Sequence, residues 1–262
     1  MNFETAHPRE IREIIKENGY LFPTAGIARG YAQGNLVVLP KELAYDFLLF
    51  AFRNPKPCPI LDVTEAGERV FRKAAPGSDI VHDLPKYRIY KEGVMTDEVT
   101  DLEEYWRDDF VAFLLGCSFT FESALIEAGI GVRHIECGCN VPMYKTNIEC
   151  EKAGIFEGPV VVSMRPLKRS EVVRAVQITS RYPGVHGAPI HIGAPEEIGI
   201  KDITKPDFGD AVPIAPGEVP VFWACGVTPQ AVAMEVKPEI MITHAPGYMF
   251  VADIKNTELA VF

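Results

Sequence analysis

The chain has 262 residues, of which 47% are hydrophobic and 24% charged, and its net charge is −10. This composition is typical of a globular protein with a sizeable core. The negative charge and the lack of a Lys- or Arg-rich block argue against a nucleic-acid partner. The apolar runs are far shorter than the roughly 20 residues that cross a bilayer, and residues 1–16 lack a secretory signal. We therefore expect a cytoplasmic protein that does not bind membranes.

The first half of the chain predicts alternating helices and strands. In chain order these are a helix at 8–18, a strand at 36–39, a helix at 40–52, strands at 60–63, 87–90 and 110–115, and a helix at 121–128. The apolar run 110–115 is typical of a strand buried on both faces, as in a parallel sheet covered by helices.

The second half of the chain has shorter predicted strands and more polar residues between them, and this pattern predicts an insertion. Its expected elements are a strand at 159–164, a helix capped by Ser170, and a compact β-α-β unit over 219–242 whose helix Thr228 caps. We therefore expect an α/β fold with a larger three-layer domain of mostly parallel strands, formed by 1–130 and 185–262. A smaller α+β domain, 131–184, is inserted into it.

Two cysteines follow apolar strands directly and precede helices. They are Cys117, in Gly116-Cys117-Ser118, and Cys225, in Cys225-Gly226-Val227-Thr228. Ligands of open α/β sheets bind beyond the carboxyl ends of strands, and helix N-termini favour anions and lower the pKa of a thiol. The turns therefore predict an anion pocket with one reactive thiol. The alternative is that each cysteine is a small apolar residue that closes its strand.

Three histidines are candidates for proton transfer, because the ordinary pKa of imidazole lies near neutrality. His186 and His191 lie in a glycine- and proline-rich loop, and His244 follows the last strand of the β-α-β unit. Their alternative role is hydrogen bonding to backbone. A divalent metal held by the loop histidines with Asp207 and Asp210 is a weaker alternative, and we expect no cofactor.

A zinc site is also weighed and disfavoured. His134, Cys137, Cys139 and Cys150 supply suitable atoms, but the two cysteines of Cys137-Gly138-Cys139 are closer than a structural zinc site normally spaces them. All six cysteines are expected as free thiols of a reducing compartment.

Polar side chains around two strands suggest where a carboxylate would bind. Arg165 directly follows a buried strand, and its guanidinium suits two-point binding of a carboxylate. Arg133 and Arg181 are further candidates, and a solvated surface arginine is the alternative for each. Asn140 and Tyr144 add hydrogen-bonding groups. No P-loop or complete GxGxxG motif is present, so nucleotide binding is not supported.

Six ordered strings resemble the hydro-lyase family related to D-glutamate cyclase. They are residues 116–122 (GCSFTFE), 140–144 (NVPMY), 161–166 (VVSMRP), 186–189 (HGAP), 222–230 (FWACGVTPQ) and 244–247 (HAPG). The resemblance implies a two-domain α/β fold with a smaller α+β part. It also implies a lyase that dehydrates D-glutamate to the lactam 5-oxo-D-proline.

That reaction suggests a role for each candidate group. Arg165 would bind the α-carboxylate of a small carboxylate substrate, with Arg133 or Arg181 in reserve, while His244 and His186 would transfer protons. Backbone N–H groups after Cys117 and Cys225 would hold the developing oxyanion.

Several alternatives stay open. A thioester on Cys117 needs more assumptions than direct acid–base chemistry, and Glu122 either faces the site or is a solvated helix residue. The protein could instead bind a carboxylate or lactam without turnover, or be a cysteine-dependent amidohydrolase. The sequence leaves the oligomeric state open.

Overall fold

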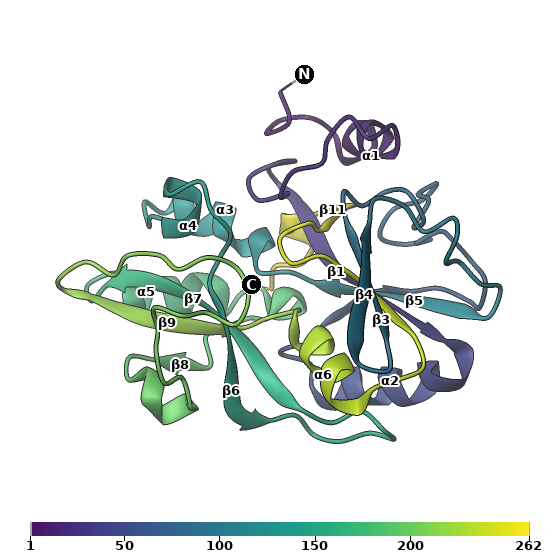
Figure 1. Cartoon of the computed structure of the whole chain (residues 1–262). Helices are drawn as coiled ribbons and strands as arrows, with labels where there is room; N and C mark the ends of the chain where they lie inside the picture. The colour runs from purple at the N-terminus through teal and green to yellow at the C-terminus, as the bar shows by residue number, and fades with distance from the viewer. Residues whose placement is uncertain (1, 262) are drawn as a thin grey trace.

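Two antiparallel β-sheets organise the chain in the computed structural model, which describes residues 2–261 (Figure 1). The larger sheet has the order β2-β5-β1-β10-β3-β4, and β11 also pairs with β1; the smaller has the order β6-β7-β9-β8. The strands of the larger sheet are β1 (Tyr31–Pro40), β2 (Ile60–Val63), β3 (Tyr87–Lys91), β4 (Val94–Val99), β5 (Phe110–Gly116), β10 (Met241–His244) and β11 (Phe250–Lys255). Those of the smaller sheet are β6 (Met143–Glu149), β7 (Pro159–Lys168), β8 (His191–Ile192) and β9 (Glu218–Ala224).

Helices surround the two sheets and join them. They are α1 (Pro8–Lys16), α2 (Lys41–Arg53), α3 (Phe119–Glu127), α4 (Arg133–Glu136), α5 (Val172–Thr179) and α6 (Thr228–Val236), with short 3₁₀ turns η1 (Pro183–Val185), η2 (Pro195–Ile198) and η3 (Asn256–Glu258). The helices predicted at 8–18, 40–52 and 121–128 are confirmed within a few residues. None of the helices formed by residues 2–261 has the length and apolar character needed to cross a membrane.

The prediction of mostly parallel strands is wrong. The paired strands run antiparallel, including β5 with both of its neighbours, β1 and β2. The continuous burial of β5 has another cause. Val111 and Phe113 pack into a core shared with α2 on one face, and Ala112 and Leu114 pack into a second core on the other. A sheet that lies between two cores buries both faces whatever the direction of its strands.

The predicted β-α-β unit over 219–242 is also wrong. Strand β9 belongs to the smaller sheet and β10 to the larger one, so α6 carries the chain from one sheet to the other. Val227 is the N-cap of α6. The Thr228 hydroxyl is not a cap, because it accepts from Val161 N and donates to Cys225 O.

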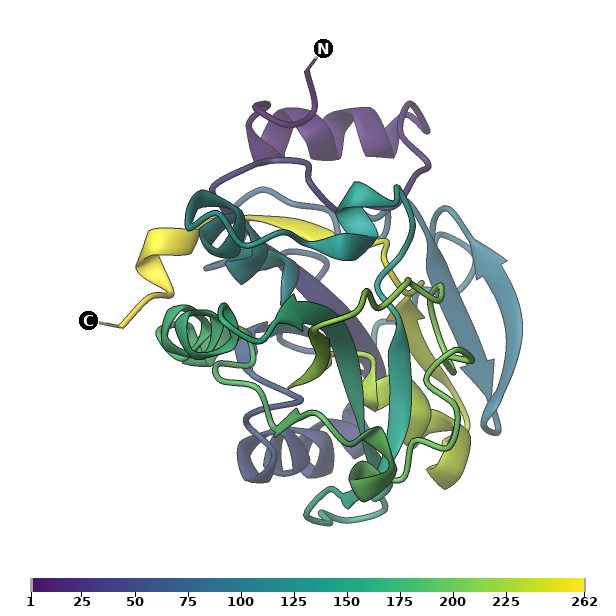
Figure 2. The same cartoon turned by 90° about the vertical axis from the view of Figure 1, so that its left-hand side faces the viewer.

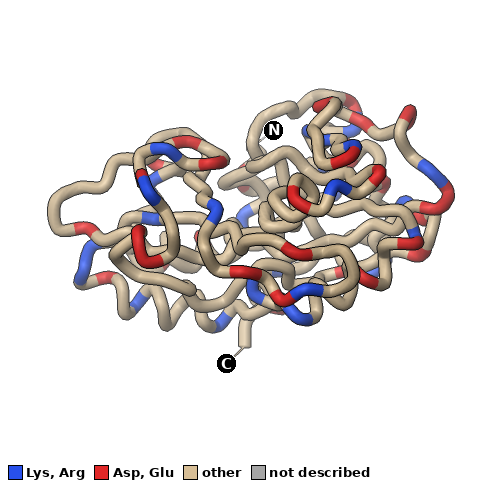
Figure 3. The backbone as a smooth tube through the Cα atoms, turned by 60° about the horizontal axis from the view of Figure 1, so that its bottom comes forward, with Lys and Arg blue, Asp and Glu red and all other residues tan. Residues whose placement is uncertain are grey.

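The two sheets define two halves of the molecule, on the right and left of Figure 1. The smaller sheet takes strands from residues 143 to 224, so it includes β8 and β9. Helix α1 lies across β11, where Arg12 donates to the Val251 carbonyl at 2.7 Å and to Asp253 at 2.9 Å (Figure 2). Lys and Arg residues alternate with Asp and Glu along both halves (Figure 3).

Candidate functional site

Strand ends from both sheets meet around one small chamber. Cys117 follows β5, Cys225 follows β9, and His244 is the last residue of β10. We call this space the chamber. Its volume is about 10 Å³, and it is lined by Asn35, Cys117, Ser118, Phe119, Asn140, Val141, Met143, Cys225, Val227, His244, Gly247 and Met249. The two cysteine turns therefore come together as the sequence predicts, although they belong to different sheets.

His244 is held in its neutral form with one ring nitrogen open. Its Nδ1 lies 3.4 Å from the Leu36 carbonyl, which only accepts, so Nδ1 carries the proton of this contact. Nε2 has no hydrogen-bond partner among residues 2–261. Burial lowers the pKa of His244 to about 4; the Leu36 carbonyl opposes this shift and the Arg88 charge adds to it. At neutral pH, Nε2 is therefore an acceptor, as a general base requires.

Two helix N-termini face the chamber. Ser118 and Phe119 begin α3, and Val227 immediately precedes α6. The N–H groups of Thr120 and Thr228 are bonded to the carbonyls of Cys117 and Cys225. The partial positive charge of each helix N-terminus still favours an anion or a developing oxyanion.

Both cysteines beside these N-termini are neutral thiols. Burial raises the pKa of Cys117 well above its usual value, against the opposing N–H of Phe119. Burial likewise raises the pKa of Cys225 to about 11, against the N–H of Val227. The prediction that this position lowers a thiol pKa is therefore wrong, because desolvation outweighs the helix terminus.

A buried ion pair supports one wall of the chamber. The Arg165 guanidinium is 1% exposed and lies between the rings of Phe121 and Trp223, 5.4 Å from each ring centre. It donates to Glu122 from Nε at 3.0 Å and also contacts this carboxylate through Nη2. Nη1 and Nη2 donate to Ser163 and Ser118, at 3.0 and 2.9 Å. Arg165 is thus engaged by protein groups rather than presented to solvent.

Glu122 is the centre of this network. Burial opposes its ionisation, but His134 and Arg165 outweigh burial and hold the pKa of Glu122 below its usual range. His134 Nε2 lies 3.3 Å from the Glu122 carboxylate, and its ring stacks on Phe119. Glu122 is 2% exposed, so the alternative of a solvated helix residue is wrong.

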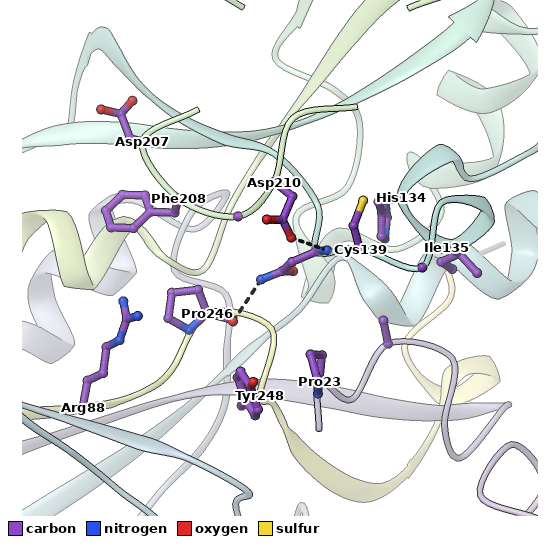
Figure 4. A pocket seen from close by; sticks show the side chains of 14 residues that line it. Pro23, Arg88, His134, Ile135, Cys139, Asp207, Phe208, Asp210, Pro246 and Tyr248 are labelled. Carbon is purple, nitrogen blue, oxygen red and sulfur yellow. Dashed lines mark hydrogen bonds between the residues drawn. The ribbon is translucent and has the colours of Figure 1, made fainter. Parts of the chain in front are cut away.

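An open cleft lies next to the chamber (Figure 4). Its volume is about 670 Å³, which is in the range of small-molecule sites. It is lined by Pro23, Ala25, Arg88, His134, Ile135, Gly138, Cys139, Asn140, Asp207, Phe208, Gly209, Asp210, Pro246 and Tyr248. Asn140 lines both spaces, so the cleft and the chamber are neighbours across this residue.

Asn140 is fixed by three hydrogen bonds. Its backbone N–H donates to Asp210 at 2.9 Å and its Nδ2 donates to the Pro246 carbonyl at 3.0 Å, the two dashed lines of Figure 4. Its Oδ1 accepts from Val141 N. A Cβ at Gly247 would lie 2.7 Å from Nδ2, so only glycine permits this packing. Asn140, predicted as a substrate-binding residue, is placed at the boundary of the two spaces.

Sequence reasoning missed two polar residues of the site. Arg88, on β3, is the only lysine or arginine among the described residues that line the cleft, and Nε donates to Glu98 at 2.9 Å. Asn35, on β1, donates to the Gly116 carbonyl at 2.7 Å and packs against Gly226. Both lie in the middle of strands, where nothing in the local sequence distinguishes them.

Other predicted residues do not line the chamber. His186 hydrogen-bonds the Lys56 carbonyl at 2.6 Å, and burial lowers its pKa to about 4. Tyr144 donates to the Ile203 carbonyl at 2.6 Å from within the core. Arg133 pairs with Glu218 and Glu136 at the outer side of the smaller sheet. The other loop histidine, His191, bonds the Ala194 carbonyl at 2.9 Å.

The cysteines considered for zinc are not brought together. Cys150 packs in the core with Cys58, whereas Cys137 is exposed and Cys139 lines the cleft. Within residues 2–261 there is no group of three or more His, Cys, Asp or Glu residues placed to hold a metal ion.

The arrangement defines a class of protein: a mixed α/β chain whose open cleft, lined by groups of both charge signs, adjoins a buried chamber with a neutral imidazole. Comparison with known sequences gives its family. The chain belongs to the D-glutamate cyclase family, whose model matches residues 111–253. That range includes both cysteine turns, Arg165 and His244, whereas Asn35 and Arg88 precede it.

Three bacterial relatives match over almost their whole length. A protein of Thermoanaerobacter sp. (strain X514) is 67% identical over 260 residues, 99% of this chain and 98% of its own length. One of Geobacillus kaustophilus is 66% identical, with 97% and 96% coverage, and YcsI of Bacillus subtilis is 64% identical, with 97% and 99%. Each carries a provisional hydro-lyase name.

A solved structure, a nitrogen repressor-like protein from Methanococcus jannaschii, matches with a TM-score of 0.38 and 9% identity, covering 90% of this chain and 91% of its own. This likeness is too weak to support an argument.

Proposed function

We propose that the protein is a hydro-lyase that interconverts D-glutamate and 5-oxo-D-proline, forming or opening the lactam with loss or gain of water. Membership of the D-glutamate cyclase family and the hydro-lyase names of the relatives support the reaction class. The observation that carries the proposal is His244, a neutral buried imidazole whose Nε2 has no hydrogen-bond partner in the described chain and which lines the chamber.

The cleft supplies groups of both signs, as an amino acid requires. Arg88 is the cation suited to a substrate carboxylate, and Asp207 and Asp210 are anions suited to an ammonium group. Arg88 replaces Arg165 in this role, because the Arg165 guanidinium is occupied by Glu122, Ser163 and Ser118. The α-carboxylate at Arg88 would leave the γ-carboxyl free to approach the chamber.

The protons of the reaction balance through one base. Cyclisation forms the bond between the amine nitrogen and the carbon of the γ-carboxyl group, and breaks one carbon–oxygen bond of that group. The ammonium loses two protons, and the departing oxygen leaves with two protons as water. His244 Nε2 can take each proton from nitrogen and return it to oxygen, so no second titrating group is needed.

The tetrahedral intermediate requires stabilisation of its oxyanion. The N-termini of α3 and α6 line the chamber, and their partial positive charge would stabilise a developing oxyanion. Ser118 adds a hydroxyl whose oxygen is held by Arg165. A thioester on Cys117 is disfavoured, because burial keeps this group in the thiol form.

Turnover in both directions tests the proposal. Purified protein is incubated with D-glutamate and, separately, with 5-oxo-D-proline, and both compounds are followed by NMR, with the L-enantiomers as matched controls. Formation of either product faster with protein than without it is expected. Thermal stabilisation by either compound without turnover, with or without added divalent metal, would instead identify a binding protein.

A further inference from the structure

The chamber has the volume that one water molecule needs. Its volume is about 10 Å³, and a polar cavity holds a water once it offers roughly 10–15 Å³ and two to four polar partners. A whole glutamate cannot enter such a space, so a substrate in the cleft can bring only its reacting group to the edge of the chamber. Whatever the cleft binds, only an atom or a small molecule the size of water can occupy the chamber.

The lining supplies both kinds of hydrogen-bonding partner. His244 Nε2 is an acceptor that has no partner within residues 2–261. Ser118 Oγ accepts from Arg165 Nη2 at 2.9 Å, which leaves the hydroxyl proton available to donate. A water that donates to Nε2 and accepts from Ser118 would meet the demands of both groups. An ordered water is one of the explanations for a buried acceptor that has no protein partner.

The residues that line the chamber are largely buried. Cys117, Ser118, Cys225 and His244 are each at most 7% exposed. Asn140, pinned by Asp210 and Pro246, lies between the chamber and the cleft. Water held here would lie one residue away from a substrate in the cleft.

We propose that the chamber is the water site of the lactam reaction. This inference rests on the proposed function. In the forward direction the chamber receives the oxygen that leaves the γ-carboxyl as water. In the reverse direction the resident water adds its oxygen to the lactam carbonyl carbon and gives one proton to His244 Nε2. The carbon–nitrogen bond breaks as nitrogen takes this proton from His244, and the second proton of the water follows to the nitrogen by the same route.

Filling the chamber tests this assignment. Cys225→Val adds volume to one wall, and Cys150→Val makes the same change in the buried core beside Cys58, away from both cleft and chamber. Val227→Ile is a second filling variant in case Cys225→Val fails to fold. Long-lived buried waters are counted by ¹⁷O magnetic relaxation dispersion, and kcat and KM are measured in both directions.

The expected result is one long-lived water fewer in Cys225→Val and in Val227→Ile than in the wild type. Their kcat should fall about 100-fold in both directions, because the loss of a positioned proton-transfer step typically slows a reaction by about this factor. Their KM should change little. Cys150→Val should keep both the water count and kcat.

Two results would overturn the water site. One is an equal number of long-lived buried waters in the wild type and in the filling variants, because this would mean that the chamber is dry. The other is a filled variant that loses the water and keeps full kcat. If the wild type turns over neither compound, the proposed function fails, and the water count alone then decides whether the chamber holds water.

Discussion

Nη2 of Arg165 donates a hydrogen bond to Oγ of Ser118 at 2.9 Å, and this contact joins a buried ion pair to the chamber wall. A charge held at 1% exposure needs compensation, which Glu122 provides from α3. Truncating one partner of such a pair leaves the other buried and unpaired, and this is strongly destabilising.

The first prediction follows from that pair. Arg165→Ala should lower the free energy of unfolding by about 3–5 kcal/mol, because Glu122 would remain buried with only His134 beside it. Arg72→Ala is the matched control: Arg72 is 66% exposed and pairs with Glu68, so its loss should change the stability little. Urea denaturation of the three proteins measures both effects. Equal losses in the two variants would contradict the buried-pair interpretation.

The second prediction concerns the pH dependence of activity. The general base must be unprotonated, and the pKa of His244 is lowered to about 4. We therefore expect kcat/KM to stay level from neutral pH down to about 5 and to fall as His244 takes up a proton near pH 4. His244→Gln should reduce kcat by about 10²–10⁴-fold. A fall of kcat/KM centred near the ordinary imidazole pKa of about 6.5 would exclude this buried histidine as the base.

The same burial affects stability. His244 and His186 take up protons in the unfolded chain below about pH 6.5, but in the folded chain only near pH 4. The unfolded state thus binds more protons between these values, so the free energy of unfolding should fall as the pH drops from 6.5 to 4. Each histidine contributes up to about 3 kcal/mol of this loss, at about 1.36 kcal/mol per pKa unit. His244→Gln should roughly halve the slope in urea titrations between pH 4 and 7.

The sequence anticipates local structure here better than it anticipates which residues meet. Helices 8–18 and 40–52 follow from apolar spacing and proline positions, which are local properties. Arg165 shows the limit. It was expected to emerge at a strand end, but β7 continues to Lys168, so Arg165 lies within the strand and faces Glu122. Where a strand ends depends on its partner, and Arg165 pairs with Val221 of β9.

For the same reason, the sequence predicts some residues of the candidate site and misses others. The turns at Cys117 and Cys225 were placed correctly beyond strand ends, since apolar runs ending at a glycine or small residue mark such ends. Arg88 and Asn35 reach the site from mid-strand positions in β3 and β1. Their role depends on antiparallel neighbours that the predicted parallel sheet does not contain.

A further prediction concerns thiol reactivity. Burial raises the pKa of Cys58, Cys117 and Cys225, so these thiols should resist alkylation near neutral pH. Cys137 is exposed and should react first with iodoacetamide. Peptide mass spectrometry after timed labelling of the native protein measures the order, and labelling in urea is the control. Rapid modification of Cys117 in the folded protein would instead favour the amidohydrolase alternative.

Another prediction tests how closely the two sheets approach. A Cβ at Gly226 would lie 1.9 Å from Nδ2 of Asn35, which is buried and bonded to the Gly116 carbonyl. Asn35 cannot move without losing this bond, so Gly226→Ala should destabilise the protein by about 1–3 kcal/mol. Gly184→Ala is the control, because the nearest atom to its added Cβ is 3.8 Å away. Comparable melting temperatures for the two variants would show that the turn after β9 adapts.

The last prediction concerns the carboxylate anchor. Arg88 lies at the cleft with its side chain 25% exposed, and Nε is held by Glu98, which also pairs with Lys86. Arg88→Gln should raise KM for D-glutamate and 5-oxo-D-proline by about 10–100-fold, since a charge-assisted hydrogen bond contributes about 1.5–3 kcal/mol. Lys86→Gln is the control, because it removes the other cation beside Glu98. Lys86 is not among the residues that line the cleft, so its loss should change KM little. Steady-state kinetics in both directions compare the variants. A larger KM effect for Lys86→Gln would move the anchor out of the cleft, whereas a loss of kcat alone in Arg88→Gln would assign Arg88 to the chemical step.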